Sequence, residues 1–336
     1  MNLRTRSSAA RRALLRMPIR ELDLHIRGSR VEPLLQRLER ELHRKLRRFR
    51  PHYYLTDEWG CPSGQPVIGI PFYLADAQLA RIEKETNDLE SPREIMMYLR
   101  HEAGHAFNYA YRLYQRPEWR DTFGSYRRRY SDDYRPVPFS REYVRHLPGW
   151  YAQKHPDEDF AETFAVWLTP KADWRRRYRG WAAMRKLLLV DRFARAFANR
   201  EPLVKRGRPD ITANEMNMTV GEYVDLSTAR ARAVYDAAFD HHLEGIFLKE
   251  GLAPRRSRPA WEIVDEHRVA LTNTIATWTG VRRAVVREIV HSIAAASKKH
   301  GFRGVRGKEK EYLVHLTAYT TALAASYLTR GKFHKV

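Results

Sequence analysis

Apolar residues in the first 75 positions recur with the periods of both strands and helices. Alternation over residues 22–26 is the pattern of a half-buried strand, and leucines recur at helical spacing between residues 31 and 49. Two further apolar runs, at residues 53–55 and 67–74, are bounded by Gly, Pro or Asp and predict two more strands. Pro71 lacks the N–H that a central strand must donate, so we expect the last strand to lie at a sheet edge.

The strongest helix signal of the chain begins at Ser91. A serine that can cap the helix is followed by a proline and, three positions on, by Glu94, which completes a capping box. A broad apolar face then continues to about residue 113. Residues 115–150 show no steady period and predict a long insertion with short helices, after which the helical pattern returns over residues 156–168.

The remainder of the chain is dominated by helical patterns. The sequence Pro-Arg-Arg-Ser-Arg-Pro at residues 254–259 interrupts them and is the best candidate for a linker. The helices predicted on either side of it cover residues 181–197, 219–247, 261–278, 281–299 and 308–328. These patterns predict an α+β fold with a small mixed sheet, followed by an all-helical C-terminal region.

Length and charge divide the chain further. At 336 residues it exceeds the usual size of one domain. The net charge of +21 comes almost entirely from residues 1–50 and 251–336, since the intervening part is nearly balanced. We therefore expect a basic tail at residues 1–17, a main domain at 18–250 and a basic helical module at 260–336. Basic ends could contact nucleic acid or an acidic partner, although solvated surface arginines explain them equally well.

The N-terminal sequence and the cysteine content predict a cytoplasmic protein. Arg16 interrupts the only apolar stretch near the N-terminus, which argues against a secretory signal. The longest apolar stretch, residues 313–328, is too short to span a bilayer. A single cysteine, Cys61, excludes an internal disulfide framework and fits a reducing compartment. We read Cys61 as an ordinary loop residue.

Two histidines and a glutamate in the helix after Ser91 form the sequence His101-Glu102-Ala103-Gly104-His105. Residues four apart share a helix face, so both imidazoles can reach one ion. Glu102 points about 100° around the helix from His101, where it can take a proton from water at the metal. In zinc hydrolases the metal lowers the pKa of that water to about 7. The alternative is a helix that carries these residues by chance.

A catalytic zinc normally has three protein ligands, and no third histidine follows within the next turns of the helix. The candidate is Glu158, in the helix predicted from residue 156. Glu162 lies one turn further on the same face, and unpaired carboxylates on a core-facing helix are costly. A zinc ion bound by Glu158 would give this carboxylate a partner, and Glu162 would have one if it orients a ligand histidine. The alternative is a solvated acidic first turn, which fits Asp157 and Asp159 better than Glu162.

These motifs carry a family resemblance. The HExxH sequence, a later tyrosine and Glu-Asp-Phe-Ala-Glu-Thr-Phe at residues 158–164 resemble the gluzincin pattern, in the variant seen in anthrax lethal factor-like peptidases. They are also similar to a family of bacterial proteins known as putative zinc-binding metallopeptidases. The resemblance rests chiefly on residues 91–168. It implies a zincin-like catalytic domain and Zn²⁺ as the cofactor.

The resemblance also implies a role for each site residue. His101, His105 and Glu158 would be the metal ligands, Glu102 the general base, and Glu162 the partner of a ligand histidine. Tyr151 matches the family's active-site tyrosine, which donates a hydrogen bond to the developing oxyanion, although it could equally be a packing residue. The insertion and the C-terminal helices depart from the lethal factor pattern, so the resemblance implies no substrate specificity.

Four other histidines are weaker candidates. His146 and the pair His241-His242 are expected to be surface or core residues, and His155 is a rival third ligand only by its position. In zincin folds an edge strand borders the cleft and pairs with the substrate, so we expect the strand at residues 67–72 to do so.

The prediction for function is a zinc-dependent metallopeptidase with a protein or peptide substrate. The alternative is a basic nucleic-acid- or protein-binding factor whose zincin-like domain is structural or degenerate. Glu102 favours the enzyme, because a structural metal site has no need of a base at that position.

Overall fold

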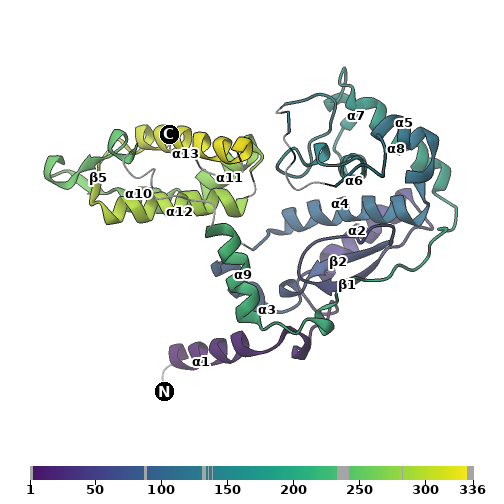
Figure 1. Cartoon of the computed structure of the whole chain (residues 1–336), viewed down its shortest axis with the longest axis horizontal. Coiled ribbons are helices and arrows are strands. Elements are labelled where there is room, and N and C mark those ends of the chain that lie inside the picture. The colour runs from purple at the N-terminus through teal and green to yellow at the C-terminus, as the bar shows by residue number, and fades with distance from the viewer. Residues whose placement is uncertain are drawn as a thin grey trace. The chain divides into compact units, whose positions relative to one another are not determined.

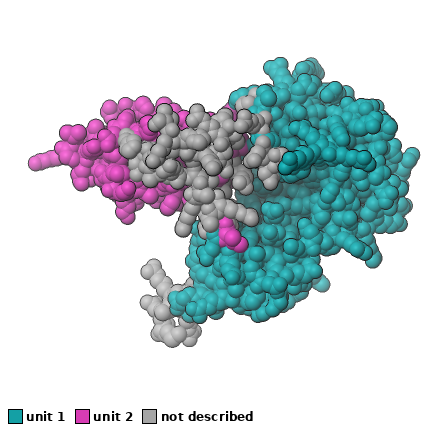
Figure 2. All heavy atoms as spheres, in the orientation of Figure 1, with its two compact units in different colours: residues 1–225 teal, residues 226–336 magenta. Residues whose placement is uncertain are grey.

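A computed structural model describes residues 3–86, 89–130, 134, 136–137, 139–232, 242–281 and 283–330. The chain divides into two compact units, Met1–Asp225 and Leu226–Val336, which Figure 2 shows in different colours. Each unit has its own hydrophobic core. The domain limits expected from the sequence stay a prediction.

The N-terminal unit combines many helices with a two-stranded sheet, as Figure 1 shows, and this confirms the α+β class. Its helices are α1 (Leu3–Arg16), α2 (Glu32–Lys45), α3 (Ala77–Thr86), α4 (Pro92–Ala110), α5 (Pro117–Phe123), α6 (Pro156–Leu168), α7 (Trp174–Arg177), α8 (Ala183–Phe197) and α9 (Val220–Arg232), which crosses the unit boundary. Strands β1 (His52–Thr56) and β2 (Val67–Pro71) pair in parallel. Short 3-10 helices cover Ile19–Glu21, Phe72–Leu74, Leu113–Gln115, Tyr151–Gln153 and Ala213–Glu215.

Helix α4 is the central helix of this unit. The predicted capping box is confirmed, because the Ser91 hydroxyl accepts from the backbone N–H of Glu94 and the Glu94 carboxylate accepts from that of Ser91. Residues 99–110 are all buried. Figure 1 shows why: α4 runs between α6 on one side and α2 and β2 on the other.

Helices α4 and α6 approach each other closely at Gly104. A Cβ atom at this position would lie 2.8 Å from Cα and 3.0 Å from the carbonyl oxygen of Ala161. Backbone atoms of a packed helix cannot give way easily, so the close approach depends on glycine. The same approach brings the first turns of α6 against the part of α4 that carries His101 and His105.

One prediction for the first 30 residues was wrong. Residues 22–26 form no strand; Leu22, Leu24 and Ile26 pack against the core from an irregular segment that has no strand partner among the described residues. Residues 3–16 form helix α1, whose last leucines also pack against the core, and the expected basic tail at residues 1–17 stays a prediction. Alternating burial therefore arises here without a ladder of backbone hydrogen bonds.

The C-terminal unit is not all-helical, which corrects the prediction. Its elements are β3 (Leu248–Lys249), a 3-10 helix (Glu250–Leu252), β4 (Ser257–Pro259), α10 (Ala260–Glu266), α11 (Arg268–Thr279), α12 (Arg283–Lys299), β5 (Phe302–Val305) and α13 (Glu309–Arg330). The strands form an antiparallel sheet in the order β3-β5-β4. Each strand has four residues or fewer, too short for a period to emerge.

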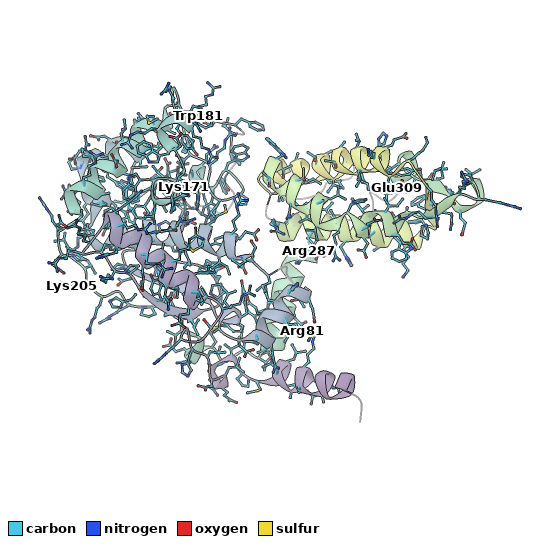
Figure 3. The ribbon with its side chains drawn as sticks, turned by 180° about the vertical axis from the view of Figure 1, so that it is seen from behind. Arg81, Lys171, Trp181, Lys205, Arg287 and Glu309 are labelled. Carbon is cyan, nitrogen blue, oxygen red and sulfur yellow. The ribbon has the colours of Figure 1, made fainter. Side chains whose placement is uncertain are left out.

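The predicted linker at residues 254–259 belongs to this sheet. Ser257 pairs with Val305 and Pro259 pairs with Arg303, so the second half of the segment is a strand. The helix predicted over residues 261–278 is divided at His267 into α10 and α11. Figure 3 labels Arg287 and Glu309, on α12 and α13 of this unit.

Among the described residues, none of the helices has both the length and the apolar composition that crossing a membrane requires.

Candidate metal centre

Three potential ligand atoms converge where α4 meets α6. Nε2 of His101 lies 2.9 Å from Oε2 of Glu158, and Nε2 of His105 lies 3.2 Å from each of those two atoms. All three residues are buried. Tetrahedral zinc with bonds of about 2.0–2.2 Å holds its ligand atoms about 3.3–3.5 Å apart. The triangle therefore needs only a small expansion to hold such an ion.

The second nitrogen of each imidazole faces another carboxylate. Nδ1 of His101 lies 2.9 Å from Oε1 of Glu162, and Nδ1 of His105 lies 3.0 Å from Oδ2 of Asp157, without the alignment of a hydrogen bond. A carboxylate favours the ring proton on the nitrogen that faces it. Both Nε2 lone pairs then point at the Glu158 carboxylate. Such a convergence of lone pairs is stabilised by a proton or a metal cation, so the donor set fits a metal ion.

Both carboxylate oxygens of Glu162 have hydrogen-bond partners. Besides His101, it contacts the insertion: its Oε2 accepts hydrogen bonds from the backbone N–H groups of His146, at 3.2 Å, and Leu147, at 2.9 Å. Its side chain is 1% exposed. The carboxylate therefore orients His101 and ties the insertion to the site.

Asp157 has the corresponding position beside His105. Its carboxylate accepts hydrogen bonds from the Asn108 side chain, at 2.8 Å, and from the Tyr109 hydroxyl. The reading of Asp157 and Asp159 as a solvated acidic turn was wrong, because both are buried and Asp159 pairs with Lys186 at 2.6 Å. Asn108 and Tyr109 were not identified from the sequence as partners of Asp157. Helical spacing places them on α4, but it does not show which residue of another helix they contact.

Burial and charge shift the pKa values of these groups. Burial would lower the pKa of His101, but its hydrogen bonds to Glu158 and Glu162 raise the pKa to about 9. Burial would raise the pKa of Glu158, yet His105 and His101 hold it well below its usual range. The pKa of Glu102 is raised, because burial outweighs the attraction of the two histidines.

Glu102 lies beside the cluster and not in it. It is 6% exposed, and in the described part of the chain its carboxylate makes no hydrogen bond to a protein group. A carboxylate with a raised pKa and no protein donor is available to exchange a proton with water.

Tyr151 and Tyr130 complete the surroundings of the cluster. The Tyr151 ring lies against His101, with ring centroids 5.5 Å apart. The Tyr130 hydroxyl donates to Oε1 of Glu158 at 2.7 Å and lies 3.4 Å from the Tyr151 hydroxyl. Tyr130 could not be predicted as a site residue, because the insertion that carries it has no regular period.

The other candidate histidines that the structure describes lie outside the cluster. Nε2 of His146 contacts the carbonyl oxygen of Met97, and Nε2 of His155 contacts that of Arg128. The His155 side chain also caps α6. His242 contacts the Tyr319 ring, and His241 lies outside the described residues.

Strand β2 does not offer its outer edge to a substrate in this structure. The N–H of Gly69 donates to the carbonyl oxygen of Gly60 at 2.7 Å, and the N–H of Val67 donates to that of Gln65 at 2.8 Å. Pro71 has no N–H to offer. The expectation that a peptide pairs with β2 is therefore unsupported.

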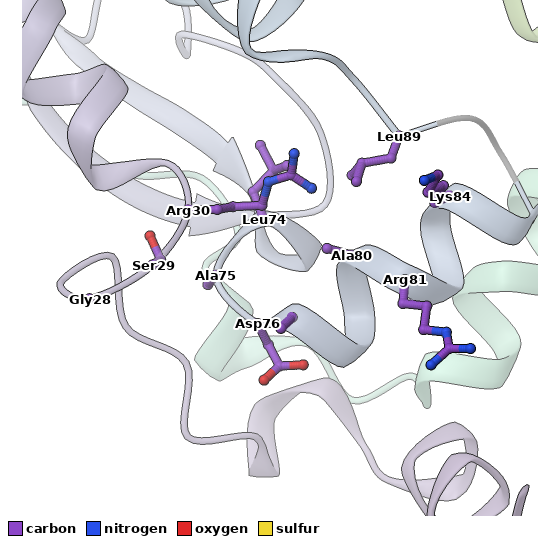
Figure 4. A pocket seen from close by; sticks show the side chains of 11 residues that line it. Gly28, Ser29, Arg30, Leu74, Ala75, Asp76, Ala80, Arg81, Lys84 and Leu89 are labelled. Carbon is purple, nitrogen blue, oxygen red and sulfur yellow. The ribbon is translucent and has the colours of Figure 1, made fainter. Parts of the chain in front are cut away.

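A pocket elsewhere in the N-terminal unit is separate from this cluster. It lies between the turn at Gly28–Arg30 and α3, and Figure 4 shows the basic side chains of Arg30, Arg81 and Lys84 around it. None of the predicted site residues lines this pocket.

Comparison with known proteins supports the metal centre. Residues 61–188 match the family model described as "Putative zinc-binding metallo-peptidase". Searches of curated proteins and of solved structures gave no match. The matched range contains both histidines, Glu102, Tyr151, Glu158 and Glu162. Over these residues the chain is similar to zinc metallopeptidases, and its buried His101, His105 and Glu158 form a site that could hold the metal.

Proposed function

We propose that this protein is a zinc-dependent metallopeptidase of the gluzincin type, with a protein or peptide substrate. The observation that carries the proposal is the convergence of His101 Nε2, His105 Nε2 and Glu158 Oε2 at a buried point beside Glu102. Each imidazole is backed by a carboxylate, as is usual for metal-binding histidines.

In this proposal His101, His105 and Glu158 would hold zinc, which would supply a water of lowered pKa, about 7, and a positive charge to polarise a carbonyl group. Glu102 accepts the proton of the attacking water and passes it to the leaving amine, a role that suits its raised pKa. Burial likewise raises the pKa of Tyr151, so its hydroxyl stays protonated and can donate to the carbonyl oxygen as negative charge develops.

A comparison of wild type with Glu102→Gln tests the function. The purified proteins are incubated with zinc and a peptide library, and new termini are counted by mass spectrometry. We expect Glu102→Gln to keep its zinc but lose roughly 10²–10⁴-fold in cleavage rate, since only the base is removed. Glu118→Gln, which changes an exposed residue of α5, is the matched control and should cleave like wild type.

Two results would count against the proposal. Cleavage by Glu102→Gln at the wild-type rate would show that Glu102 is not the base. Zinc bound by wild type without cleavage of any peptide would favour the alternative, a basic binding factor with a structural metal site. A titration with DNA at several salt concentrations would test that alternative, because phosphate contacts weaken steeply as salt rises.

A further inference from the structure

The two carboxylate oxygens of Glu158 have different partners. Oε2 faces both histidines, at 2.9 and 3.2 Å. Oε1 accepts a hydrogen bond of 2.7 Å from the hydroxyl of Tyr130, which comes from the insertion between α5 and α6. A carboxylate can bind a metal through one oxygen or through both. The Tyr130 hydroxyl occupies the oxygen that would make the second bond.

The direction of the hydrogen bonds around Tyr130 is fixed by the number of protons. A carboxylate that serves as a metal ligand carries no proton and can only accept, and the Tyr130 hydroxyl is the donor of this hydrogen bond. Tyr130 must therefore donate its one hydroxyl proton to Glu158. Its oxygen is left as an acceptor, and the Tyr151 hydroxyl lies 3.4 Å away and can donate to it, at the long end of hydrogen-bond distances. The chain of donors runs from Tyr151 through Tyr130 to Glu158.

Tyr130 lies at the exposed edge of the metal-binding cluster. The residue is 48% exposed, so it borders both the solvent and the cluster. Its ring lies 5.3 Å from the His155 ring, and the Lys154 ammonium lies 4.4 Å from its centroid. Both neighbours lie just before α6, so the ring is seated against the segment that leads into Glu158.

We propose that Tyr130 is a positioning residue that holds Oε1 of Glu158, so that Glu158 offers a single oxygen to the metal. The Tyr130 hydroxyl oxygen also accepts a hydrogen bond from the Tyr151 hydroxyl until substrate binds. This inference rests on the proposed zinc site. It assigns a role to a residue that neither the HExxH motif nor the Glu158 helix contains.

The test compares Tyr130→Phe with Tyr114→Phe, Glu158→Ala and the Tyr130→Phe/Glu158→Ala double variant. Tyr114→Phe is the matched control, since in the described part of the chain the Tyr114 hydroxyl hydrogen-bonds to the Gln115 side chain and to no residue of the cluster. Zinc affinity is measured by competition with a chelator, and Co²⁺-loaded proteins are compared by visible absorption, which responds to coordination number.

We expect Tyr130→Phe to lose about 10–100-fold in zinc affinity, the usual cost of removing a partner of a metal ligand. Its cobalt absorption should weaken as Glu158 turns to bind through both oxygens. In the Glu158→Ala background the same change should have no further effect, because a residue that acts through Glu158 has nothing left to act on. Tyr114→Phe should match wild type throughout.

Three results would overturn the inference. The first is a Tyr130→Phe protein with wild-type zinc affinity and an unchanged cobalt spectrum. The second is an equal loss of affinity in both backgrounds, which would mean that Tyr130 does not act through Glu158. The third is a melting temperature of zinc-free Tyr130→Phe so far below that of zinc-free wild type that unfolding alone explains the loss of zinc affinity. None of these measurements uses a substrate. The result for Tyr130 can therefore be interpreted even if the protein proves not to be a peptidase.

Discussion

At Glu162, two carboxylate oxygens face three hydrogen-bond donors: the His101 ring and the backbone N–H groups of His146 and Leu147. A glutamine at this position would have one acceptor oxygen and one NH₂ group. Its NH₂ group would have to face either the two backbone N–H groups or the His101 ring. The first arrangement sets donor against donor, and the second moves the His101 proton to Nε2 and blocks metal binding. We therefore expect Glu162→Gln to bind zinc about 10–100-fold more weakly than wild type in a chelator competition.

The ranking of variants makes this prediction sharper. Glu158→Gln should bind zinc more weakly still, because it removes a ligand and a charge that neutralises the ion. Glu118→Gln, on the exposed side of α5, should bind like wild type. Equal affinity in all four proteins would leave only the histidine pair as a binding site.

Protons and zinc compete for His101, which predicts opposite effects of pH on the two forms of the protein. In the metal-free fold the pKa of His101 is raised from 6.5 to about 9, so this histidine adds stability below pH 6.5 that is lost as the pH rises through 9. Zinc needs the deprotonated ring, so its affinity should rise over the same range, by about tenfold per pH unit for each proton displaced. Thermal unfolding with and without zinc should show melting temperatures that diverge as pH rises; parallel curves would contradict the assignment.

The sequence could predict those site residues whose positions follow from helix geometry. His101 and His105 share a face because they are four apart, and the same spacing links Glu158 to Glu162. Asp157 could not be predicted in the same way, since a first-turn acid is usually solvated and its burial depends on partners in another helix.

At the level of the elements, the packing of α4 on α6 depends on the missing side chain of Gly104. In Gly104→Ala the new Cβ would meet the Ala161 backbone, so the helices must separate. We expect a loss of about 1–3 kcal/mol in the free energy of unfolding of the zinc-free protein, measured in urea. Zinc affinity should fall as well, because α6 carries Glu158 away from the histidines.

Gly251→Ala is the control for this change. No atom lies within 4 Å of a Cβ at Gly251, so its unfolding free energy and zinc affinity should stay at wild-type values. A Gly104→Ala protein as stable as wild type would mean that the two helices can separate there at little cost.

Elements with a defined start were predicted well, as were the five-residue strands β1 and β2, whereas the strands of four residues or fewer were not predicted. The capping residues fix where α4 begins, and proline opens α6, so both helices could be predicted from local chemistry. Strand β5 forms because β3 and β4 pair with it, and such partners are not visible in a run of four residues. Residues 22–26 show the converse error, an alternating pattern without a partner strand.

On the scale of the whole molecule, every proposed ligand belongs to one unit. The buried core of Met1–Asp225 ends at Val220, and all ligand residues lie between His101 and Glu158. We expect a chain of residues 1–232, which ends with α9, to fold and to bind zinc as tightly as the full chain. Circular dichroism and chelator competition on the purified fragment provide the measurement. A fragment that folds but binds zinc more weakly would show that the C-terminal unit supports the site.

The separation of the ligands along the chain determines when the protein can acquire its metal. During synthesis, His101 and His105 leave the ribosome well before Glu158, and two imidazoles alone make an incomplete and exchangeable site. Glu158 arrives only after the insertion has been made and α6 has closed against Gly104. With the proposed ligand set, we therefore expect stable loading with zinc to come late in synthesis, and a chain truncated within the insertion to release the metal.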